Sequence, residues 1–302
     1  MPAKPLPNAH PVEVIGGEDL SAELLAKRDA LHCRLRELAS VIVAYSGGVD
    51  SAYLAHAAHT VLGSKMLAII ADSASLSRRH LREAVAFAAS QSIPLVTVAT
   101  GELASEDYAR NDATRCFHCK DELFTVLERE RTARELAHVV YGLNSDDTRD
   151  YRPGQHAASQ HAVQAPLAEA GLNKEDVRTL ARAAALDVWD KPASACLSSR
   201  IEYGRRVTPE VLEQVERAED ALAALGLRRF RVRHHGTVAR IEIAPEEMDA
   251  ALNRETFQRI GAAVRAAGFQ YAAIDCEGYR SGSMNEVLPL TVLQASKPIL
   301  SS

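Results

Sequence analysis

The sequence lacks any apolar run that approaches the roughly 20 residues of a membrane-spanning helix. Its first residues, MPAKPLPNAHPVEVIGGED, lack the charged start and the apolar stretch of a signal peptide. It has only five cysteines, an odd number that does not fit the disulfide framework of a small secreted protein. These absences predict a cytoplasmic protein with reduced thiols and no membrane partner.

An excess of basic residues is also missing. Lys and Arg together number 35 and Asp and Glu 40, so the net charge is −5 with His neutral. This balance argues against a protein that mainly coats nucleic acid or an anionic membrane, although it leaves room for a local basic site. With 47% hydrophobic and 25% charged residues, the composition is that of a folded globular chain, and 302 residues suggest two domains.

Apolar, β-branched runs alternate with helical patterns over the first two thirds of the chain. The runs typical of buried strands are 41–45, 66–72, 94–100 and 138–142. The segments that favour helices are 19–39, 50–62, 77–91, a stretch that follows Cys119, and 173–186. This alternation predicts an α/β fold with a parallel, doubly wound sheet. Residues 143–165 are polar and predict a long loop at the carboxyl edge of that sheet, where ligands bind in such folds.

The pattern changes near residue 206. Residues 208–225 predict a helix, and the runs 228–235 and 237–243 alternate around Gly236 as the strands of a hairpin do. The remaining elements expected are helices at 245–252 and 254–267 and a strand at 271–276. The sequence therefore predicts a flexible arm at 1–18, a larger domain at 19–206 and a smaller α+β domain at 207–302.

A glycine-rich turn follows the first predicted strand. Its residues are Ser46, Gly47, Gly48, Val49, Asp50 and Ser51. Adjacent glycines bring backbone amides close to an anion, the following helix N-terminus adds partial positive charge, and the serines donate hydroxyls. The motif therefore predicts a phosphate cradle, but not a Walker loop, because no GKS or GKT follows. The alternative is a glycine turn that is merely capped by serine and aspartate.

Three cysteines lie in segments that favour reactivity. Cys196 has Arg200 four positions on, and a nearby guanidinium favours the thiolate. Cys116 and Cys119 form a CxxC within RCFHCK, which suits a redox pair, half of a zinc site or part of an iron–sulfur site. Simple packing is the alternative for Cys196. The other two cysteines, Cys33 and Cys276, are expected to be small packing residues.

Residues 227–240 contain five arginines, two histidines and no acid. Strand alternation places Arg231 and Arg233 on one face, where two guanidiniums can hold a phosphate. Glu242 on the partner strand is placed to orient one of them. A solvated, charged face is the alternative.

SGGVDS resembles the loop of the ATP pyrophosphatase (PP-loop) superfamily, whose members cleave ATP between the α and β phosphates, usually with Mg²⁺, and attach AMP to a substrate oxygen. The resemblance implies ATP at residues 46–51, with Asp72 and Ser73 beside the nucleoside and Gly142 as a further wall. Together with five further segments, SGGVDS resembles the ATP-dependent sacrificial sulfur transferase family (LarE type) over about residues 20–290. The further segments are RCFHCK, GLNSDDTRDYRPG, KPASACLSSRI, RVRHHGTVARIE and GYRSGSMNE.

That family converts pyridinium-3,5-biscarboxylic acid mononucleotide to the bisthiocarboxylic form in nickel-pincer nucleotide synthesis. The resemblance implies adenylation of a carboxylate, attack by the Cys196 thiolate and C–S cleavage that leaves dehydroalanine on the protein. The CxxC implies an alternative in which Cys116, Cys119 and Cys196 hold a [4Fe–4S] cluster and sulfide is delivered catalytically.

The resemblance also implies a site for the phosphate of the substrate nucleotide, formed where subunits meet in an assembly of six, a dimer of trimers. The residues implied for this site are Arg200, Arg231, Arg233 and Glu242.

Other functions share parts of this pattern. A tRNA-thiolating enzyme would need an RNA-binding extension, and one short arginine cluster on an acidic chain does not supply it, so no nucleic-acid partner is expected. An amidating synthetase would need a source of ammonia or a glutaminase. A nucleotide-binding thiol or metal sensor would differ from all of these in releasing no pyrophosphate.

Overall fold

The computed structural model describes residues 20–147, 153–192, 195–251, 253–280 and 283–284. Two compact units make up this part of the chain. The first comprises its residues up to 196 together with Tyr203–Thr208, and the second comprises Leu197–Glu202 and its residues from 209 onward. The predicted arm at 1–18 and the end of the predicted second domain, 285–302, lie outside the described residues, and the predicted domain boundaries stay a prediction.

Four parallel strands form the sheet of the first unit, in the order β3-β2-β1-β4. They are β1 (Val41–Ala44), β2 (Met66–Asp72), β3 (Leu95–Ala99) and β4 (His138–Tyr141). In the central strand, Ile42 lies opposite Leu67 of β2 and Val139 of β4. The predicted α/β fold with a parallel sheet is therefore confirmed.

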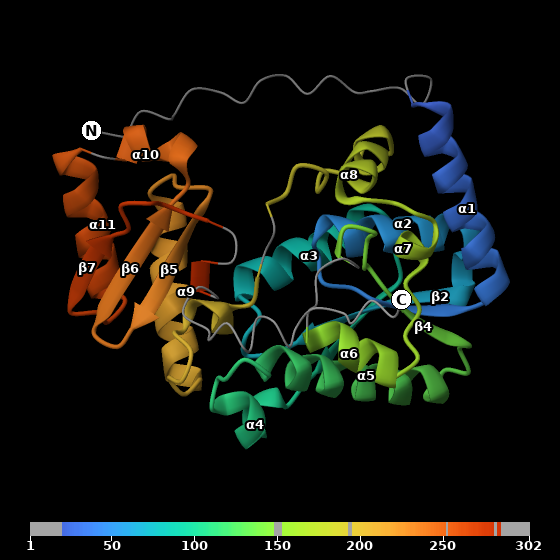
Figure 1. Ribbon diagram of the computed structural model, residues 1–302, viewed down its shortest axis with the longest axis horizontal. Coiled ribbons are helices and arrows are strands. Elements are labelled where there is room, and N and C mark those ends of the chain that lie inside the picture. Colours follow the sequence, from blue (N-terminus) through green and yellow to red (C-terminus); the bar gives the residue numbers. More distant parts are fainter. Residues whose placement is uncertain (1–19, 148–152, 193–194, 252, 281–282, 285–302) are drawn as a thin grey trace, which may run out of the picture. The chain divides into compact units, whose positions relative to one another are not determined.

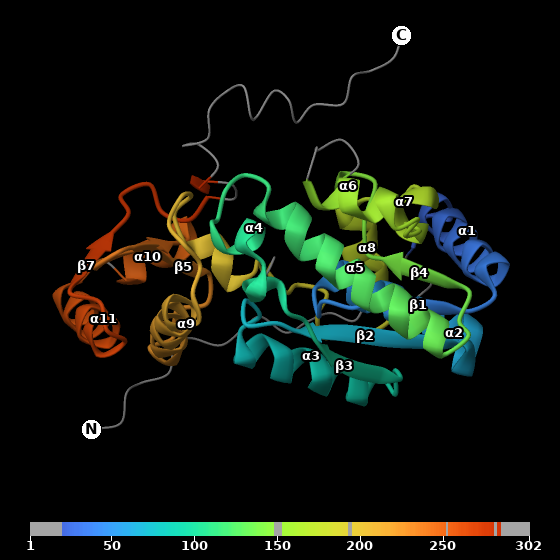
Figure 2. The same ribbon diagram turned by 90° about the horizontal axis from the view of Figure 1, so that it is seen from below.

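Helices cover both faces of this sheet (Figures 1 and 2). The helices of this unit are α1 (Ala22–Leu38), α2 (Val49–Leu62), η2 (Gly63–Lys65), α3 (Arg78–Ser90), η3 (Glu102–Ala104), α4 (Glu106–Ala109), α5 (Arg115–Ala133), α6 (Pro153–Gln160), α7 (Pro166–Glu169) and α8 (Lys174–Ala183). Val41 and Val43 pack into a cluster with residues of α1, α2, α3, α7 and α8, whereas Ile42 packs with α5 and α6. Alternate residues of one strand thus serve opposite layers, which explains why the strand is apolar throughout.

Two predictions about this unit were wrong. The helix expected after Cys119 begins earlier, at Arg115. The backbone N–H of Thr114, just before it, donates to the Asp112 carboxylate at 2.7 Å. The CxxC therefore lies inside the first turns of α5. The predicted loop at 143–165 contains α6, which Pro153 opens in a position that suits proline. Burial of Ala157 and Ala158 against the sheet stabilises this helix despite its polar sequence.

The second unit has a three-stranded sheet in the order β5-β6-β7. Its elements are η5 (Leu197–Arg200), α9 (Pro209–Ala224), β5 (Phe230–His235), β6 (Val238–Ile243), α10 (Pro245–Ala251), α11 (Arg254–Ala266) and β7 (Tyr271–Ile274). Strands β5 and β6 are antiparallel, which confirms the predicted hairpin, and Gly236 has φ +67 in its turn. Strand β7 runs parallel to β6.

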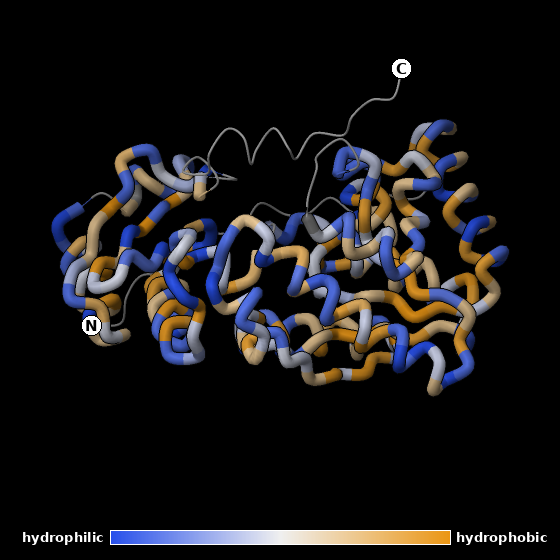
Figure 3. The backbone as a smooth tube through the Cα atoms, turned by 60° about the horizontal axis from the view of Figure 1, so that its bottom comes forward, coloured by the Kyte–Doolittle hydropathy of each residue, from blue (hydrophilic) through white to orange (hydrophobic). Residues whose placement is uncertain are grey.

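Hydropathy follows this architecture. Figure 3 shows long hydrophobic stretches inside the larger unit and alternating colours along the helices around it. Within the ranges given above, no helix is both long and apolar enough to cross a membrane.

Candidate active site

The SGGVDS motif forms the turn between β1 and α2. Gly47 has φ +71, and a Cβ there would come within 2.5 Å of the Ala84 Cβ, so this position requires glycine. The backbone N–H of Ser46 donates to Ser51 Oγ at 3.1 Å, and that hydroxyl donates to the Gly48 carbonyl at 3.1 Å. Gly48 caps α2 without a side-chain bond. The loop thus presents the first N–H groups of a helix, as an anion site does.

Two residues from other elements fix this loop. Nε2 of His80 in α3 lies 2.6 Å from the carbonyl oxygen of Ser46, and burial lowers the pKa of His80 below its ordinary value. The neutral ring can therefore donate its Nε2 proton to that carbonyl. Gly142, at the end of β4, lies against α2 so closely that a Cβ would come within 2.8 Å of the Ser51 nitrogen.

Asp50 is the second residue of α2 and has two differently placed oxygens. Oδ2 forms an ion pair with Nζ of Lys174, the first residue of α8. Oδ1 is buried and has no hydrogen-bond partner within the described part of the chain. Asn144 follows Gly142 by two residues, is fully buried, and its Nδ2 also lacks a partner there. Unpartnered buried polar atoms are rare in proteins, and here two of them follow the ends of β1 and β4.

The end of β2 carries two further predicted residues. Asp72 forms an ion pair with Arg78, and that arginine also donates to the Ser73 carbonyl at 2.8 Å. The Ser73 hydroxyl is bonded to the buried carboxylate of Glu102. Asp72 and Ser73 therefore reach the carboxyl edge of the sheet, as predicted, and are held there by partners of their own.

A pocket opens between the carboxyl ends of β1 and β2. It is lined by Ala44, Tyr45, Ser46, Ile69, Ile70, Ala71, Leu76, Lys120 and Leu123. Ser46 belongs to the glycine-rich loop, and Lys120 belongs to α5 directly after Cys119. Mostly apolar walls with a few polar groups are typical of small-ligand sites. The pocket thus joins the loop to the helix that carries the CxxC.

The three cysteines singled out by the sequence belong to this same unit and are free thiols. Cys116 is exposed, and Cys119 and Cys196 are partly buried. Burial, with the nearby charges of Cys196 and Cys116, raises the pKa of Cys119 to about 12. The three sulfurs are thus close enough to interact electrostatically. Among the residues that the structure describes, no group of three or more His, Cys, Asp or Glu is arranged to hold a metal ion.

Arg115 is a buried cation beside two of these thiols, with only 4% of its surface exposed. It donates to the side-chain oxygen of Asn111, and its guanidinium carbon lies 5.7 Å from the centre of the Tyr203 ring. Burial opposes its charge, but the charges of Cys196 and Cys116 raise the pKa of Arg115 above its ordinary value. The sequence placed Arg200 near the Cys196 thiol. Arg200 pairs with Glu219 in the second unit at 2.9 Å, and Arg115 is an arginine whose charge interacts with Cys196.

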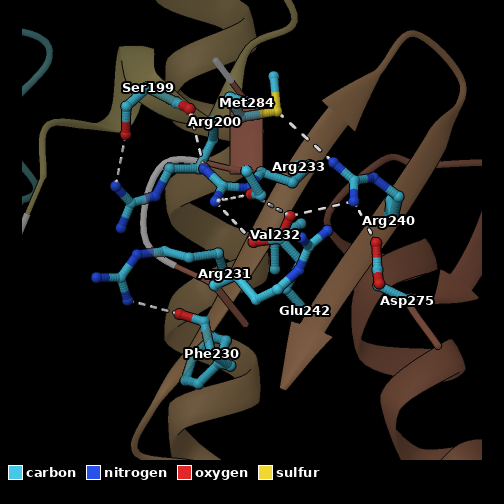
Figure 4. A network of polar contacts seen from close by, with 12 residues as sticks. Ser199, Arg200, Phe230, Arg231, Val232, Arg233, Arg240, Glu242, Asp275 and Met284 are labelled. Atoms are coloured by element: carbon cyan, nitrogen blue, oxygen red, sulfur yellow. Dashed lines mark hydrogen bonds and ion pairs between the residues drawn. The ribbon is translucent and has the colours of Figure 1, made fainter. Parts of the chain in front are cut away.

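The second unit contains a network of arginines and carboxylates (Figure 4). Arg233 pairs with Glu242 at 2.6 Å, and the two side chains are 7% and 0% exposed. Glu242 also pairs with Arg240 at 3.1 Å and accepts a hydrogen bond from Ser283 Oγ at 3.0 Å. The prediction that Glu242 orients an arginine of the hairpin is confirmed. Arg233 is buried and paired with Glu242, and the expectation that Arg231 and Arg233 together hold a phosphate stays a prediction.

Arg231 lies apart from that ion pair. Its guanidinium carbon is 4.8 Å from the centre of the Tyr279 ring, and NH1 donates to the Phe230 carbonyl at 2.7 Å (Figure 4). Burial and the charge of Arg200 lower the pKa of Arg231 from its ordinary value. Glu219 accepts a bond from the Val232 N–H at 3.1 Å and pairs with Arg200. Carboxylates outside residues 227–240 thus neutralise much of a segment that has no acid of its own.

The comparisons with known proteins agree with the sequence resemblance. No protein-family model matches the chain. An uncharacterized protein of Synechocystis sp. is 40% identical over 265 residues, which is 88% of this chain and 99% of that protein. The pyridinium-3,5-bisthiocarboxylic acid mononucleotide synthase of Lactiplantibacillus plantarum is 32% identical over 268 residues, 88% of this chain and 96% of that protein. The chain belongs to the LarE-type family of these synthases.

In this LarE-type chain the predicted residues fall into two groups. The loop residues 46–51, Asp72, Ser73, Gly142 and the three thiols belong to the first unit. Arg200, Arg231, Arg233 and Glu242 belong to the second. The prediction that Cys33 and Cys276 pack in the interior was wrong, because both are exposed. Cys33 lies on the side of α1 away from its buried leucines, and Cys276 follows an exposed edge strand.

Sequence reasoning missed three charged residues of this LarE-type chain, namely Arg115, Lys174 and Glu219. Arg115 stands beside a motif that was recognised, so its position next to Cys116 was an available signal. Lys174 is 124 residues from its partner Asp50, and Glu219 is 19 residues from its partner Arg200. Neither pairing has a local pattern, because each is set by the packing of elements distant along the chain.

Proposed function

We propose that this protein is an ATP-dependent sulfur transferase of nickel-pincer nucleotide synthesis. It adenylates a carboxylate of pyridinium-3,5-biscarboxylic acid mononucleotide and installs sulfur through Cys196. The L. plantarum relative is named for the bisthiocarboxylic product of this conversion. The observation that carries the proposal is that the glycine-rich loop and the thiol of Cys196 belong to one compact unit, in which buried Arg115 interacts with that thiol.

ATP occupies the SGGVDS loop in this proposal, as in the PP-loop superfamily. The N-terminal N–H groups of α2 bind phosphate oxygens, and the pocket between β1 and β2 takes the nucleoside. Mg²⁺ prefers oxygen ligands, and the unpartnered Oδ1 of Asp50 fits that preference. The metal supplies charge neutralisation for the phosphates. The substrate carboxylate displaces pyrophosphate from the α phosphate and becomes an acyl-adenylate.

The Cys196 thiolate then attacks the acyl carbon, forming a thioester and releasing AMP. Arg115 is the cation beside this thiol, and a guanidinium favours the thiolate form that attacks. Removal of the Cys196 α proton and cleavage of the Cβ–S bond leave the sulfur on the substrate as a thiocarboxylate. The protein retains dehydroalanine, so each such turnover consumes one Cys196.

The second route in this proposal uses a [4Fe–4S] cluster held by Cys116, Cys119 and Cys196. The residue types fit such a cluster, because the three cysteines form no disulfide, belong to one unit and interact electrostatically. Such a cluster with three protein ligands supplies a fourth iron that can hold an extra sulfide. The thiol of Cys119 has a pKa of about 12, so a cation or cluster is needed to keep it deprotonated.

In this proposal the second unit binds the phosphate of the substrate nucleotide through Arg231 with Arg200 and Arg233, and Glu242 orients Arg233. A six-subunit assembly, a dimer of trimers, would complete this site. Arg233 and Arg229 each have a carboxylate partner, Glu242 and Glu246. This pairing favours a small phosphate ligand over a nucleic-acid backbone, which would require several uncommitted cations.

The full chain, purified without oxygen, tests the proposal when mixed with ATP, Mg²⁺ and pyridinium-3,5-biscarboxylic acid mononucleotide. We expect AMP, pyrophosphate and a thiolated nucleotide, each dependent on that substrate. Binding of ATP without substrate-dependent pyrophosphate release would favour a sensor instead. Iron and sulfide assays on the same sample and on Cys116→Ala separate the two sulfur routes, because only the cluster route loses both in the variant.

A further inference from the structure

Asn111 has a rare backbone conformation in the connection between α4 and α5. Its φ is +59, in the left-handed region that glycine adopts more readily than other residues, and its side chain is fully buried. Residues other than glycine persist in that region where their surroundings hold them, and such residues gather at functional sites. Because glycine would fit this backbone with less strain, the contacts of the Asn111 side chain are what the asparagine contributes.

The two polar atoms of that side chain contact different segments of the first unit. Nδ2 donates to the Arg205 carbonyl at 2.9 Å, and Oδ1 accepts a hydrogen bond from the guanidinium of Arg115. The backbone carbonyl of Asn111 also accepts a hydrogen bond from the Gly204 N–H at 3.0 Å. One buried residue therefore joins the start of α5 to a segment that follows Cys196 in the sequence.

These contacts fix the place of the Arg115 charge. The guanidinium carbon lies 5.7 Å from the centre of the Tyr203 ring, in the same segment as Gly204. Burial opposes the charge of Arg115, and the charges of Cys196 and Cys116 raise its pKa nevertheless. The amide oxygen of Asn111 is a neutral acceptor, so it orients the guanidinium without cancelling its charge. A carboxylate in the same place would attract that charge away from the thiols.

We propose that Asn111 is a positioning residue for sulfur transfer, which acts by holding the guanidinium of Arg115 toward the sulfur of Cys196. The inference rests on the proposed function, because it assumes that Cys196 attacks the acyl-adenylate. The guanidinium stabilises the negative charge that the sulfur carries in this attack. Adenylation depends on the glycine-rich loop, whereas the side chain of Asn111 contacts Arg115 and Arg205. The two steps should therefore respond differently to the loss of this side chain.

Two assays on the full chain, purified without oxygen, separate the steps. Exchange of labelled pyrophosphate into ATP, dependent on pyridinium-3,5-biscarboxylic acid mononucleotide, measures adenylation. Formation of thiolated nucleotide in a single turnover measures sulfur transfer. Asn111→Gly suits the backbone at φ +59 and removes both side-chain hydrogen bonds. We expect exchange within about twofold of the wild type and sulfur transfer about ten- to hundredfold slower, the usual effect of losing a hydrogen bond to a charged group.

Asn111→Asp tests the same role with a side chain of the same shape, and it gives the same comparison if Asn111→Gly does not fold. Its carboxylate attracts the charge of Arg115, so sulfur transfer should again fall while exchange persists. Glu135→Gly is the matched control, because Glu135 is an exposed residue with φ +56 just beyond the other end of α5. It is expected to change neither rate. Circular dichroism establishes that each variant is folded.

The Arg115→Met background decides whether Asn111 acts through Arg115. If it does, Asn111→Gly causes no further loss of sulfur transfer once the guanidinium is absent. An equal loss in the wild-type and Arg115→Met backgrounds would overturn the inference, because Asn111 would then act independently of Arg115. A parallel fall in exchange and sulfur transfer would also overturn it, since that result indicates a general structural role.

The outcome for the wild-type chain separates this inference from the proposed function. If the wild type shows neither exchange nor thiolated nucleotide, both fail. If it shows both, and Asn111→Gly transfers sulfur at the wild-type rate, only the role of Asn111 fails.

Discussion

Gly142 and Ser51 approach so closely that a Cβ on Gly142 would lie 2.8 Å from the backbone nitrogen of Ser51. The contact joins the end of β4 to the first turn of α2, which carries the phosphate loop. It also involves the Asp50 carbonyl carbon, at 3.0 Å from the same Cβ position. Backbone atoms, rather than a flexible side chain, limit the space, so the loop can keep its position only when residue 142 is glycine.

Gly142→Ala is therefore expected to displace the loop. We expect a loss of about 1–3 kcal/mol in the free energy of unfolding, as for other overpacked sites, and weaker ATP binding. Urea denaturation and nucleotide titration measure the two effects. Gly101→Ala is the matched control, because a Cβ there meets nothing closer than the Glu122 carboxylate at 3.8 Å. Equal behaviour of the two variants would show that the close approach has no consequence.

His80 makes stability depend on pH. Burial lowers its pKa in the folded protein below the ordinary value of 6.5. As pH falls below 6.5, the unfolded chain takes up the proton first, so this contribution to stability is lost down to the folded pKa. His80→Gln cannot titrate and keeps a side-chain donor for the Ser46 carbonyl. Melting temperatures between about pH 7.5 and 5.5 should fall less steeply in this variant than in the wild type. Equal slopes would contradict the assignment to His80.

Arg231 is expected to act on the substrate and not on ATP. It is half-buried against Tyr279, and its charge is opposed by burial and by Arg200. A substrate phosphate would relieve that cost, so Arg231→Met should raise KM for the pyridinium nucleotide about tenfold or more and leave KM for ATP unchanged. Arg228→Met, which removes an exposed arginine of the same segment, serves as the control. A parallel rise in both KM values would point to a structural role for Arg231.

The buried ion pair of Arg233 and Glu242 should contribute strongly to the stability of the second unit. Both side chains are buried, so Arg233→Met leaves a buried carboxylate with less compensation and should cost about 3–5 kcal/mol of unfolding free energy. Arg233→Met/Glu242→Met removes both charges and should recover much of that loss. Arg206→Met breaks the exposed pair with Glu106 and should produce no resolvable change in the same urea titration.

Local patterns account for what the sequence could predict. The strand at 41–45 and the turn at 46–51 follow from residue types within one short window, and the structure places both as expected. The burial of Arg233 could not be predicted that way. Strand alternation correctly places Arg233 and Val232 on opposite faces of β5. However, the guanidinium of Arg233 donates to the Ser199 carbonyl and to the Ser283 hydroxyl, and the residue pattern of 228–243 does not predict these contacts.

The prediction of a loop where α6 lies was wrong for a related reason. Its polar residues, with a proline and a glycine at its start, have the composition of a loop, and the buried side of the helix consists of the small residues Ala157 and Ala158. Alanines carry little apolar area, so they give a weak periodic signal even where they are fully buried. The pairing of Lys174 with Asp50 could not be recognised, because the two residues are 124 positions apart, whereas the position of Arg115 next to Cys116 was an available signal.

The central claim is that Cys196 transfers sulfur in a reaction driven by ATP. The most direct test mixes the anaerobic full chain with ATP, Mg²⁺ and pyridinium-3,5-biscarboxylic acid mononucleotide, and measures nucleotide products and intact protein mass by mass spectrometry. We predict a thiolated nucleotide and AMP from the wild type and from the exposed-thiol control Cys33→Ala. We predict none of the thiolated product from Cys196→Ala, which should still bind ATP. In the sacrificial route the wild-type mass falls by one H₂S at Cys196, whereas the cluster route leaves it unchanged. Thiolated nucleotide formed by Cys196→Ala would contradict the account.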